Sequence, residues 1–360
     1  MKQDNYNVIG VMSGTSLDGV DLAQIQLTLH NNKWTFKIIE SETVRYEQNW
    51  VNQLKLAVDY PETELEKLNA AYTKLLGKII SEFIEKHKIE NLDAVCSHGH
   101  TILHQPEKGL TLQIGNLPEI SSFINQTVVC DFRVQDVKLG GQGAPLVPIG
   151  DRLLFSEYDY CMNLGGFSNV SFEWEENRIA FDISPVNTVL NFYANQLGFD
   201  YDDKGQISKT GNCNAALLME LNNLDFYQTR FPKSLGFEFV KETILPIIDS
   251  YSISTADKLR TFSEHIAVQI ALALPNKSGS LLVTGGGAYN DFLIERIKIH
   301  LPKITLIIPS KKIIELKEAL LFGLLGVLKL REEINVLSSV TGAKKDHSSG
   351  YIYKNSANCD

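Results

Sequence analysis

The feature that most constrains the fold is an order of strands and helices that occurs twice along the chain. Three consecutive strands are expected within residues 7–39, and an amphipathic helix is expected over residues 65–83. The second half repeats this plan, with three strands between residues 158 and 183 and a helix from about 186 to 196. Two copies of the same order predict a duplicated α/β architecture.

Further elements complete each half. Short apolar segments over residues 92–97 and 127–130 predict buried strands in the first half. In the second half, we expect a helix over residues 256–274 and a strand over residues 280–284 that runs into three glycines. These segments place helices and strands alternately after each set of three strands.

The length of 360 residues suits two domains rather than one. The most flexible stretch of the first half is Gly140–Pro145, and we place the boundary there. The predicted domains are residues 1–145 and 146–330. The polar tail, from about residue 331 to residue 360, is expected to pack back on the first domain.

Composition excludes several classes of protein. The chain has 34 Lys and Arg against 43 Asp and Glu, a net charge of −9, which argues against a nucleic-acid or anionic-membrane binder. Its longest fully apolar run, Ala319–Leu328, is about half the roughly 20 residues that a membrane span needs. The first residues, MKQDNYNVIGVMSG, have no apolar signal-peptide core. The five cysteines are scattered without a CxxC pair, so neither a disulfide framework nor a cysteine zinc site is indicated. We expect a cytoplasmic protein.

Three glycine-rich turns follow expected strands: Ser13–Gly19, Asn163–Gly166 and Gly285–Gly287. Glycine lets the backbone N–H groups approach an anion closely. Any one of these turns is equally well explained as an ordinary turn. Three of them in a chain with two similar halves favour a nucleotide held between domains. None matches the Walker motif or the dinucleotide GxGxxG motif, which disfavours a P-loop NTPase and a Rossmann dehydrogenase.

Acidic residues accompany two of these turns. Asp18 and Asp21 follow the first, and Asp182 ends the strand that comes after the second. Phosphoryl transfer uses carboxylates to hold Mg²⁺ or to accept a proton. A solvated or turn-capping role is the alternative, and it is strong for Asp21.

Three histidines lie close together in the sequence at His98, His100 and His104. They do not share one helical face, and no nearby cysteine or acidic pair completes a zinc set. We therefore favour a strand end whose polar groups, His98 among them, face a sugar.

Two further charged residues are candidates for ligand binding. Arg133 follows a buried strand and can pair with a carboxylate or phosphate in a bidentate manner, or else with its neighbour Asp131 at the surface. Glu318 stands beside an apolar helical segment, and its spacing fits either a ligand-binding group or the polar edge of that helix.

Taken together, several sequence blocks resemble those of the anhydro-N-acetylmuramic acid kinases, and the resemblance covers essentially the whole chain. The blocks are Gly10–Asp21, Ser97–Thr101, Leu112–Asn116, Val129–Arg133, Gly140–Pro148, Asn163–Asn169, Tyr201–Gly205, Pro232–Ser234, Thr284–Asn290, Glu318–Gly323 and Val340–Ala343. The resemblance implies a duplicated actin-like ATPase (ribonuclease H-like) fold, with two domains around a nucleotide cleft, and a homodimer. It implies ATP and Mg²⁺ as cofactors and an amino sugar as substrate.

The resemblance also implies a reaction of peptidoglycan recycling. Water opens the 1,6-anhydro ring of anhydro-N-acetylmuramic acid, O6 takes the γ-phosphoryl group, and N-acetylmuramic acid 6-phosphate and ADP are formed. By similarity, Asp182 is the base that activates the water, and Arg133 and Glu318 contact the sugar. No protein-only metal cage is expected; Mg²⁺ is held through ATP, with Asp18 as a candidate ligand. The nucleotide-binding candidates are Gly14, Thr15, Ser16, Leu17, Asp18, Gly19, Val20, Asp21, Asn163, Gly165, Gly166, Gly285, Gly286 and Gly287.

One block departs from the family pattern. Where the family usually has Asp-Thr-Gly-Pro-Gly-Asn, this chain has Asp182-Ile-Ser-Pro-Val-Asn187, so that Ser184 and Val186 replace two glycines. Valine is poorly suited to positive φ, so this loop either has a different backbone or was never left-handed. A kinase of a different amino sugar and a non-catalytic ATP-binding regulator are therefore the alternatives to the activity above.

Overall fold

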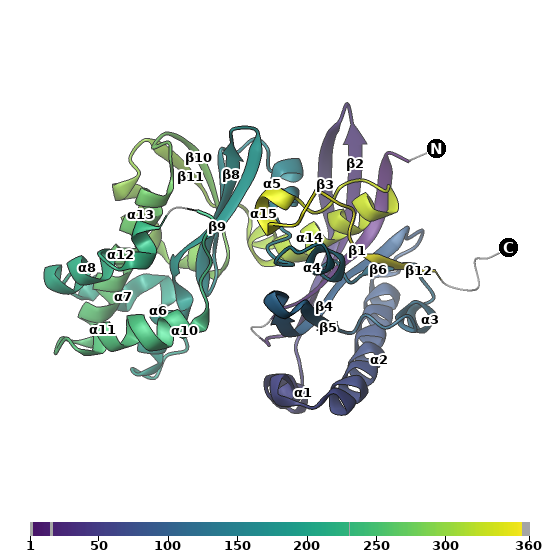
Figure 1. Ribbon diagram of the computed structural model, residues 1–360, viewed down its shortest axis with the longest axis horizontal. Coiled ribbons are helices and arrows are strands. Elements are labelled where there is room, and N and C mark those ends of the chain that lie inside the picture. The colour runs from purple at the N-terminus through teal and green to yellow at the C-terminus, as the bar shows by residue number, and fades with distance from the viewer. Residues whose placement is uncertain (1–2, 15–16, 230, 355–360) are drawn as a thin grey trace. The chain divides into compact units, whose positions relative to one another are not determined.

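The computed structural model describes residues 3–14, 17–229 and 231–354 (Figure 1). The chain forms two compact units. The first unit comprises Met1–Leu154 and Leu316–Asp360, and the second comprises Phe155–Glu315. The domain division predicted from the sequence, at residues 145/146 and 330/331, stays a prediction.

The first unit is built on one mixed sheet in the order β12-β6-β4-β1-β2-β3, with β5 paired to β4. Strands β1, β2 and β3 form an antiparallel meander, and β4 and β6 continue the sheet in parallel. Its strands are β1 (Asn5–Ser13), β2 (Val20–His30), β3 (Lys33–Val44), β4 (Ala94–Gln105), β5 (Leu110–Ile114), β6 (Val128–Cys130) and β12 (Tyr351–Tyr353). Asn31 and Asn32, both with positive φ, form the turn between β2 and β3, as the Asn-Asn pair in the sequence indicates.

The second unit repeats that order in its own sheet, β11-β10-β7-β8-β9. Strands β7, β8 and β9 form the meander, and β10 and β11 lie parallel beyond β7. Its strands are β7 (Tyr160–Leu164), β8 (Phe167–Trp174), β9 (Asn177–Pro185), β10 (Gly279–Thr284) and β11 (Ile304–Ile307). Because β11-β10-β7-β8-β9 matches β6-β4-β1-β2-β3 strand for strand, the duplicated actin-like α/β fold is confirmed.

Helices cover the first sheet. The long α2 buries the regularly spaced Leu65, Leu68, Ile79 and Phe83 against it, as its apolar period predicts. The helices of this unit are α1 (Gln48–Leu56), η1 (Ala57–Asp59), α2 (Glu62–His87), η2 (Pro106–Lys108), α3 (Ile120–Ile124), α4 (Val134–Lys138), α5 (Pro148–Leu154), α14 (Lys311–Leu330, whose first turn belongs to the second unit) and α15 (Ser338–Thr341).

Helix α14 packs unusually close to the strands of the first unit. A Cβ at Gly10 of β1 would collide with the carbonyl oxygen of Ala319, and one at Gly326 would collide with the sulfur of Cys96. Helix α5 belongs to the same packing, since Gly150 lies against Leu321 of α14. This contact is why the first compact unit continues past Gly140–Pro145 to Leu154.

The second unit has a large apolar core between its sheet and its helices. Helix α12, which the sequence predicts over residues 256–274, buries Phe262, Ile266 and Ile270 in that core. The helices are α6 (Asn187–Asn195), η3 (Asp203–Gly205), α7 (Gln206–Thr210), α8 (Ala215–Asn222), α9 (Asp225–Gln228), α10 (Phe237–Phe239), η4 (Val240–Ile244), α11 (Leu245–Asp249), α12 (Thr255–Ala273), η5 (Gly286–Tyr289) and α13 (Asp291–His300). Across the described parts of both units, no helix combines the length and apolarity that crossing a bilayer requires.

Two elements differ in extent from the sequence prediction. Strand β4 does not end near Ser97 but runs on to Gln105, because β5 pairs with its second half. The three histidines are therefore strand residues. Helix α14 begins at Lys311, ahead of the apolar segment beside Glu318, so Glu318 lies in the middle of the helix.

Candidate functional site

Two of the three predicted glycine turns lie together in the second unit, at the carboxyl ends of the parallel strands β7 and β10. Asn163 pairs with Thr284 in the register of these strands. The Gly165 carbonyl accepts a hydrogen bond from the Asn187 N–H (3.2 Å), which ties this turn to the start of α6. Gly285 has φ +81°, and a Cβ there would lie 2.5 Å from Asn163 Oδ1, so the position requires glycine. The carboxyl edge of a parallel sheet is where α/β folds bind ligands.

A cavity of about 700 Å³ adjoins these turns within the second unit. Its size is typical of small-molecule sites. Its lining combines the start of α6, η3 and its flanks, and the turn around η5: Asn187, Leu190, Asn191, Tyr201, Asp202, Asp203, Lys204, Gly286, Ala288, Tyr289, Asn290, Asp291, Ile308, Lys311 and Glu315. Of the predicted site residues, Gly286 is in this lining.

The third glycine turn joins β1 to β2 in the first unit. Leu17 and Gly19 both have positive φ, and a Cβ at Gly19 would collide with the Val44 carbonyl oxygen, so glycine is required there. Asp18 is exposed, and Asp21 accepts a hydrogen bond from the Thr43 hydroxyl (2.5 Å). Gly14 and Val20 flank the turn, whereas the predicted residues Thr15 and Ser16 lie outside the described residues.

A buried cluster of polar side chains anchors the end of β1 just before this turn. Ser13 Oγ lies 2.9 Å from His100 Nδ1, and the hydroxyls of Tyr46 and Tyr72 join Ser13 in the same cluster. Burial lowers the pKa of His100 to about 4, so its ring is neutral near pH 7. Sequence reasoning missed the cluster, because its members come from β1, β4, α2 and the segment after β3.

The imidazole of His98 and the guanidinium of Arg133 form a directed pair. Arg133 Nε donates to His98 Nε2 (2.9 Å), and Arg133 Nη1 donates to the Gly143 carbonyl (2.9 Å). His98 Nδ1 donates to the Gly99 carbonyl (2.8 Å), so His98 is a neutral ring with its proton on Nδ1. Burial and the Arg133 charge hold the pKa of His98 well below its usual value, consistent with this tautomer.

Arg133 is oriented by His98 and Gly143 rather than by its neighbour Asp131. Asp131 instead accepts a hydrogen bond from the Asn116 side chain (2.9 Å), and burial raises its pKa to about 6. Burial lowers the pKa of Arg133 to about 10, which leaves it a cation at neutral pH. The surface-pair alternative for Arg133 is therefore wrong.

Glu318 belongs to the same neighbourhood of the first unit. Phe322, one turn further along α14, packs its ring 4.6 Å from the ring of His98. The Glu318 side chain is exposed, yet surrounding protein atoms raise its pKa by desolvation, and the nearby positive charge of Arg133 opposes that rise. The negative charges of Asp21 and Asp18 raise the pKa further. The structure thus brings together His98, Arg133 and Glu318.

The predicted histidine cluster is not arranged as a metal site. His98 faces Arg133, His100 faces Ser13, and His104 Nδ1 lies 3.1 Å from the Thr111 hydroxyl. Within residues 3–14, 17–229 and 231–354, no group of three or more His, Cys, Asp or Glu side chains is placed to hold a metal.

Asp182 lies on β9, opposite Asn169 of β8. Its Oδ2 accepts a hydrogen bond from the Leu235 N–H (2.9 Å), and its own N–H donates to the Lys233 carbonyl (3.0 Å). The side chain is half-buried, and burial raises its pKa while the Leu235 hydrogen bond opposes the rise. Asp182 is therefore a carboxylate fixed through one oxygen, with an elevated proton affinity.

Residues 6–355 match the sequence model of a family described as anhydro-N-acetylmuramic acid kinase. The chain belongs to the anhydro-N-acetylmuramic acid kinase family. It is 34% identical to the anhydro-N-acetylmuramic acid kinase of Coxiella burnetii (strain RSA 493 / Nine Mile phase I), over 98% of this chain and 98% of that protein. It is 35% identical to the protein of that name in Pseudomonas fluorescens (strain Pf0-1), over 96% and 99%.

Among solved structures, component A of the (R)-2-hydroxyglutaryl-CoA dehydratase of Acidaminococcus fermentans matches with a TM-score of 0.46 and 13% sequence identity. The match covers 91% of this chain and 99% of that chain.

The block after Asp182 that departs from the family pattern has no left-handed residue at either replaced glycine. Val186 has φ −129° and is fully buried, and Ser184 is not among the residues with positive φ. The Ser168 hydroxyl donates to the Ser184 carbonyl (3.0 Å) and accepts from the Ser184 N–H (3.1 Å). The loop is therefore not left-handed at Ser184 or Val186, as both expectations for it require.

Proposed function

We propose that this protein is an ATP-dependent kinase of 1,6-anhydro-N-acetylmuramic acid that opens the anhydro ring with water and phosphorylates O6. The water oxygen bonds to C1 as the C1–O6 bond breaks, and O6 takes the γ-phosphoryl group of ATP. The products are N-acetylmuramic acid 6-phosphate and ADP, a step of peptidoglycan recycling. Membership of the kinase family over residues 6–355 carries this proposal.

Asp182 is the proposed base. A water that attacks an anomeric carbon must lose a proton, and a positioned carboxylate with a raised pKa is suited to take it. The Leu235 N–H fixes Oδ2 and leaves Oδ1 as the oxygen that can accept this proton. The raised pKa of Asp182 supports the same role.

Arg133 and Glu318 are the proposed sugar-binding groups, and His98 is proposed to support them in the same site. A guanidinium has a planar set of donors, which suits a carboxylate such as the lactyl group of the sugar. Glu318 supplies acceptors for hydroxyl or amide hydrogens. The role of His98 is to hold Arg133, because its Nε2 accepts the Arg133 Nε–H.

The second-unit cavity is the proposed site of the nucleoside part of ATP. Its apolar groups, such as Leu190 and Ala288, are combined with polar groups from Asn187 and Lys204, as is usual in small-molecule sites. The turns at Asn163–Gly166 and Gly285–Gly287 are proposed to face the phosphates with their backbone N–H groups.

The turn Gly14–Asp21 is also proposed to contact the phosphates. ATP would supply most of the ligands of Mg²⁺. The exposed carboxylate of Asp18 would add one more, because carboxylate oxygen is a preferred magnesium ligand. When bound, Mg²⁺ offsets the negative charge of the phosphates.

A cytoplasmic homodimer completes the proposal, and it is supported only by the resemblance of the sequence. Light scattering of the purified protein tests the dimer: a mass twice 40.3 kDa is expected, and a monomer would contradict it.

Incubation with the anhydro sugar and Mg-ATP in ¹⁸O-labelled water tests the reaction. We expect ADP and sugar phosphate in equal amounts, with the label at C1 and none in the phosphate. Label in the phosphate would indicate ATP hydrolysis instead, and the absence of ADP with this sugar would reject the proposal. A panel of other amino sugars, tested in the same way, distinguishes a kinase of different specificity.

A further inference from the structure

Asp136 of α4 is a fully buried carboxylate in the first unit, and its two oxygens bind different parts of the chain. Oδ2 accepts a hydrogen bond from the Gly143 N–H (2.7 Å). Oδ1 accepts one from the Thr341 hydroxyl (2.7 Å) and lies 3.6 Å from His347 Nε2. A buried carboxylate is stable only with such partners. Asp136 therefore fixes two segments to each other: the loop at residues 139–147, between α4 and α5, and the C-terminal part of the chain.

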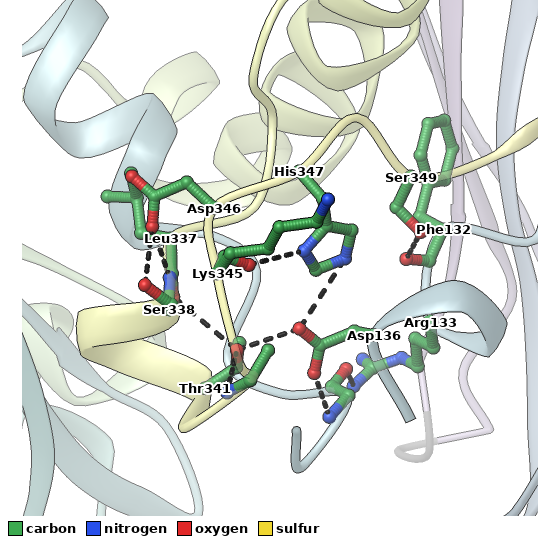
Figure 2. Close-up of polar contacts among 12 residues, drawn as sticks. Phe132, Arg133, Asp136, Leu337, Ser338, Thr341, Lys345, Asp346, His347 and Ser349 are labelled. Carbon is green, nitrogen blue, oxygen red and sulfur yellow. Dashed lines mark hydrogen bonds and ion pairs between the residues drawn. The ribbon is translucent and has the colours of Figure 1, made fainter. Parts of the chain in front are cut away.

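The C-terminal segment, residues 338–349, supplies the contacts on one side. Figure 2 shows Thr341 and His347 pointing toward Asp136 from this segment. The segment is itself held in place, because the Ser349 hydroxyl donates to the Phe132 carbonyl (2.6 Å). Beyond it, β12 pairs antiparallel with β6 at the edge of the sheet. The polar tail is thus a built part of the first unit.

Backbone bonds join the C-terminal segment to the loop as well. The Gln142 N–H donates to the Thr341 carbonyl (2.8 Å), and the Lys344 N–H donates to the Leu139 carbonyl (3.2 Å). Thr341 therefore makes two contacts: its carbonyl accepts from Gln142 of the loop, and its hydroxyl donates to Asp136 of α4. The loop has little freedom while this segment is in place.

Gly143 carries these contacts on to Arg133. Its N–H is held by Asp136, and its carbonyl accepts from Arg133 Nη1 (2.9 Å). Gly143 has φ +69°, and a Cβ there would lie 2.9 Å from a methyl carbon of Val137, so the position requires glycine. Because both of its backbone polar groups are bonded, Gly143 links the Asp136 carboxylate to the Arg133 guanidinium.

We propose that the C-terminal segment is a positioning element for the sugar site. Thr341 orients Asp136, Asp136 orients Gly143, and the Gly143 carbonyl fixes the direction in which Arg133 presents its guanidinium. The role of Arg133 in sugar binding is that of the proposed function, on which this inference rests. Thr341 and Asp136 touch no reacting atom in this scheme and are positioning residues.

His347 lies beside the Thr341–Asp136 pair and makes no hydrogen bond to Asp136. Its Nδ1 donates to the Lys345 carbonyl (3.1 Å), which fixes the ring, and its Nε2 lies 3.6 Å from Asp136 Oδ1. The orientation of Asp136 therefore rests on its bonds to Thr341 and Gly143.

The test replaces the Thr341 hydroxyl in the full chain while keeping the size of the side chain. Thr341→Val removes the hydrogen bond to Asp136, and Thr341→Ser restores the hydroxyl. We expect the valine variant to raise KM for the anhydro sugar about fivefold to twentyfold, with KM for ATP within about twofold of wild type. The serine variant is expected to stay within about twofold for both.

Lys345→Ala is the matched control, because its side chain is exposed on the same segment and its carbonyl still accepts from His347. An unchanged sugar KM in Thr341→Val would overturn the proposal. Equal rises in both KM values would also overturn it, since a merely loosened fold affects both substrates.

Hydrogen exchange separates this inference from the proposed function. If the wild-type protein forms no ADP with the anhydro sugar, the proposed function fails, and the positioning claim is judged on amide exchange in peptides covering residues 133–145. Faster exchange in Thr341→Val, with wild-type exchange in Thr341→Ser, is the expected result. Wild-type exchange in the valine variant would overturn the claim.

Discussion

The candidate groups of the two units are held in different ways. In the first unit, Arg133 is oriented by two partners, His98 and Gly143, and Gly143 is in turn bound by Asp136. In the second unit, the Asp182 carboxylate receives one hydrogen bond, from the Leu235 backbone. The two units share their strand order, so the fold itself does not impose this difference.

The difference corresponds to two chemical tasks. A group that binds a substrate gains from a fixed orientation, because no ordering cost is then incurred on binding. A general base needs an accessible oxygen and a proton affinity raised toward the working pH. Multiple partners would lower the pKa of a carboxylate, whereas the half-buried Asp182 has its pKa raised.

Replacement of the base is expected to have the largest effect. Asp182→Asn keeps the shape of the side chain and the acceptor for the Leu235 N–H but cannot take a proton. We expect kcat to fall by roughly 10²–10⁴, the usual contribution of a general base. Steady-state ADP release measures this fall, and Asp59→Asn, at an exposed site on η1, is the control. Wild-type turnover in Asp182→Asn would remove Asp182 from the mechanism.

Arg133→Lys is expected to rank second. Lysine keeps the charge but loses the fork that donates to His98 and Gly143 at once. We expect KM for the anhydro sugar to rise about 10- to 100-fold while KM for ATP changes little. Isothermal titration with the sugar alone provides a second readout. A rise confined to ATP would place Arg133 at the nucleotide instead.

A substitution in the second-unit cavity is expected to change KM for ATP rather than KM for the sugar. Asn187 lines the cavity, and its side chain donates to the Leu164 carbonyl (3.3 Å). Asn187→Ala is expected to raise KM for ATP about threefold to tenfold and to leave the sugar KM unchanged. Asn195→Ala, exposed on the same helix, is the control. Sugar KM rising in Asn187→Ala would contradict a nucleotide role for this cavity.

The smallest expected effect concerns the pH dependence of stability. Because the folded protein raises the pKa of Asp182 above 3.8, it binds this proton more tightly than the unfolded chain. The free energy of unfolding therefore falls as pH rises from about 3.8 through the raised pKa of Asp182. At pH 7, Asp182→Asn is expected to raise Tm by about 2 °C, and the difference should vanish near pH 3. Thermal unfolding at both pH values measures it, and a lower Tm at pH 7 would contradict the raised pKa.

The ionisation of Asp182 also governs activity. Asp182 must be ionised to act as a base, so kcat/KM is expected to fall as pH drops through its raised pKa. This acid limb should be absent from the residual activity of Asp182→Asn. An identical limb in the variant would assign it to another group.

Local patterns in the sequence predict the scaffold well. The apolar period of α2, the turn at Asn31 and Asn32, and the glycines after β7 are all decided by neighbouring residues. Such features depend on backbone preference and helical spacing, which a single sequence contains. The repeated order of strands and helices predicted the duplicated architecture, and the resemblance of whole blocks added the family and its actin-like fold.

The contacts that orient the site could not be predicted in this way. Thr341 and Asp136 are far apart in the chain, and nothing in the polar composition of the tail indicates that His347 is buried. The cavity likewise gathers Asn187, Tyr201 and Lys311 from separate segments. The sequence pattern predicts only the first half of β4, because the second half is stabilised by pairing with β5 rather than by its own composition.

The most direct test is a crystal structure with the anhydro sugar and a non-hydrolysable ATP analogue bound. We predict that Asp182 Oδ1 lies about 2.6–3.2 Å from a water that faces C1 of the sugar, while Oδ2 keeps its bond to the Leu235 N–H. An Asp182 carboxylate turned away from C1, with another side chain on that water, would contradict its role as the base.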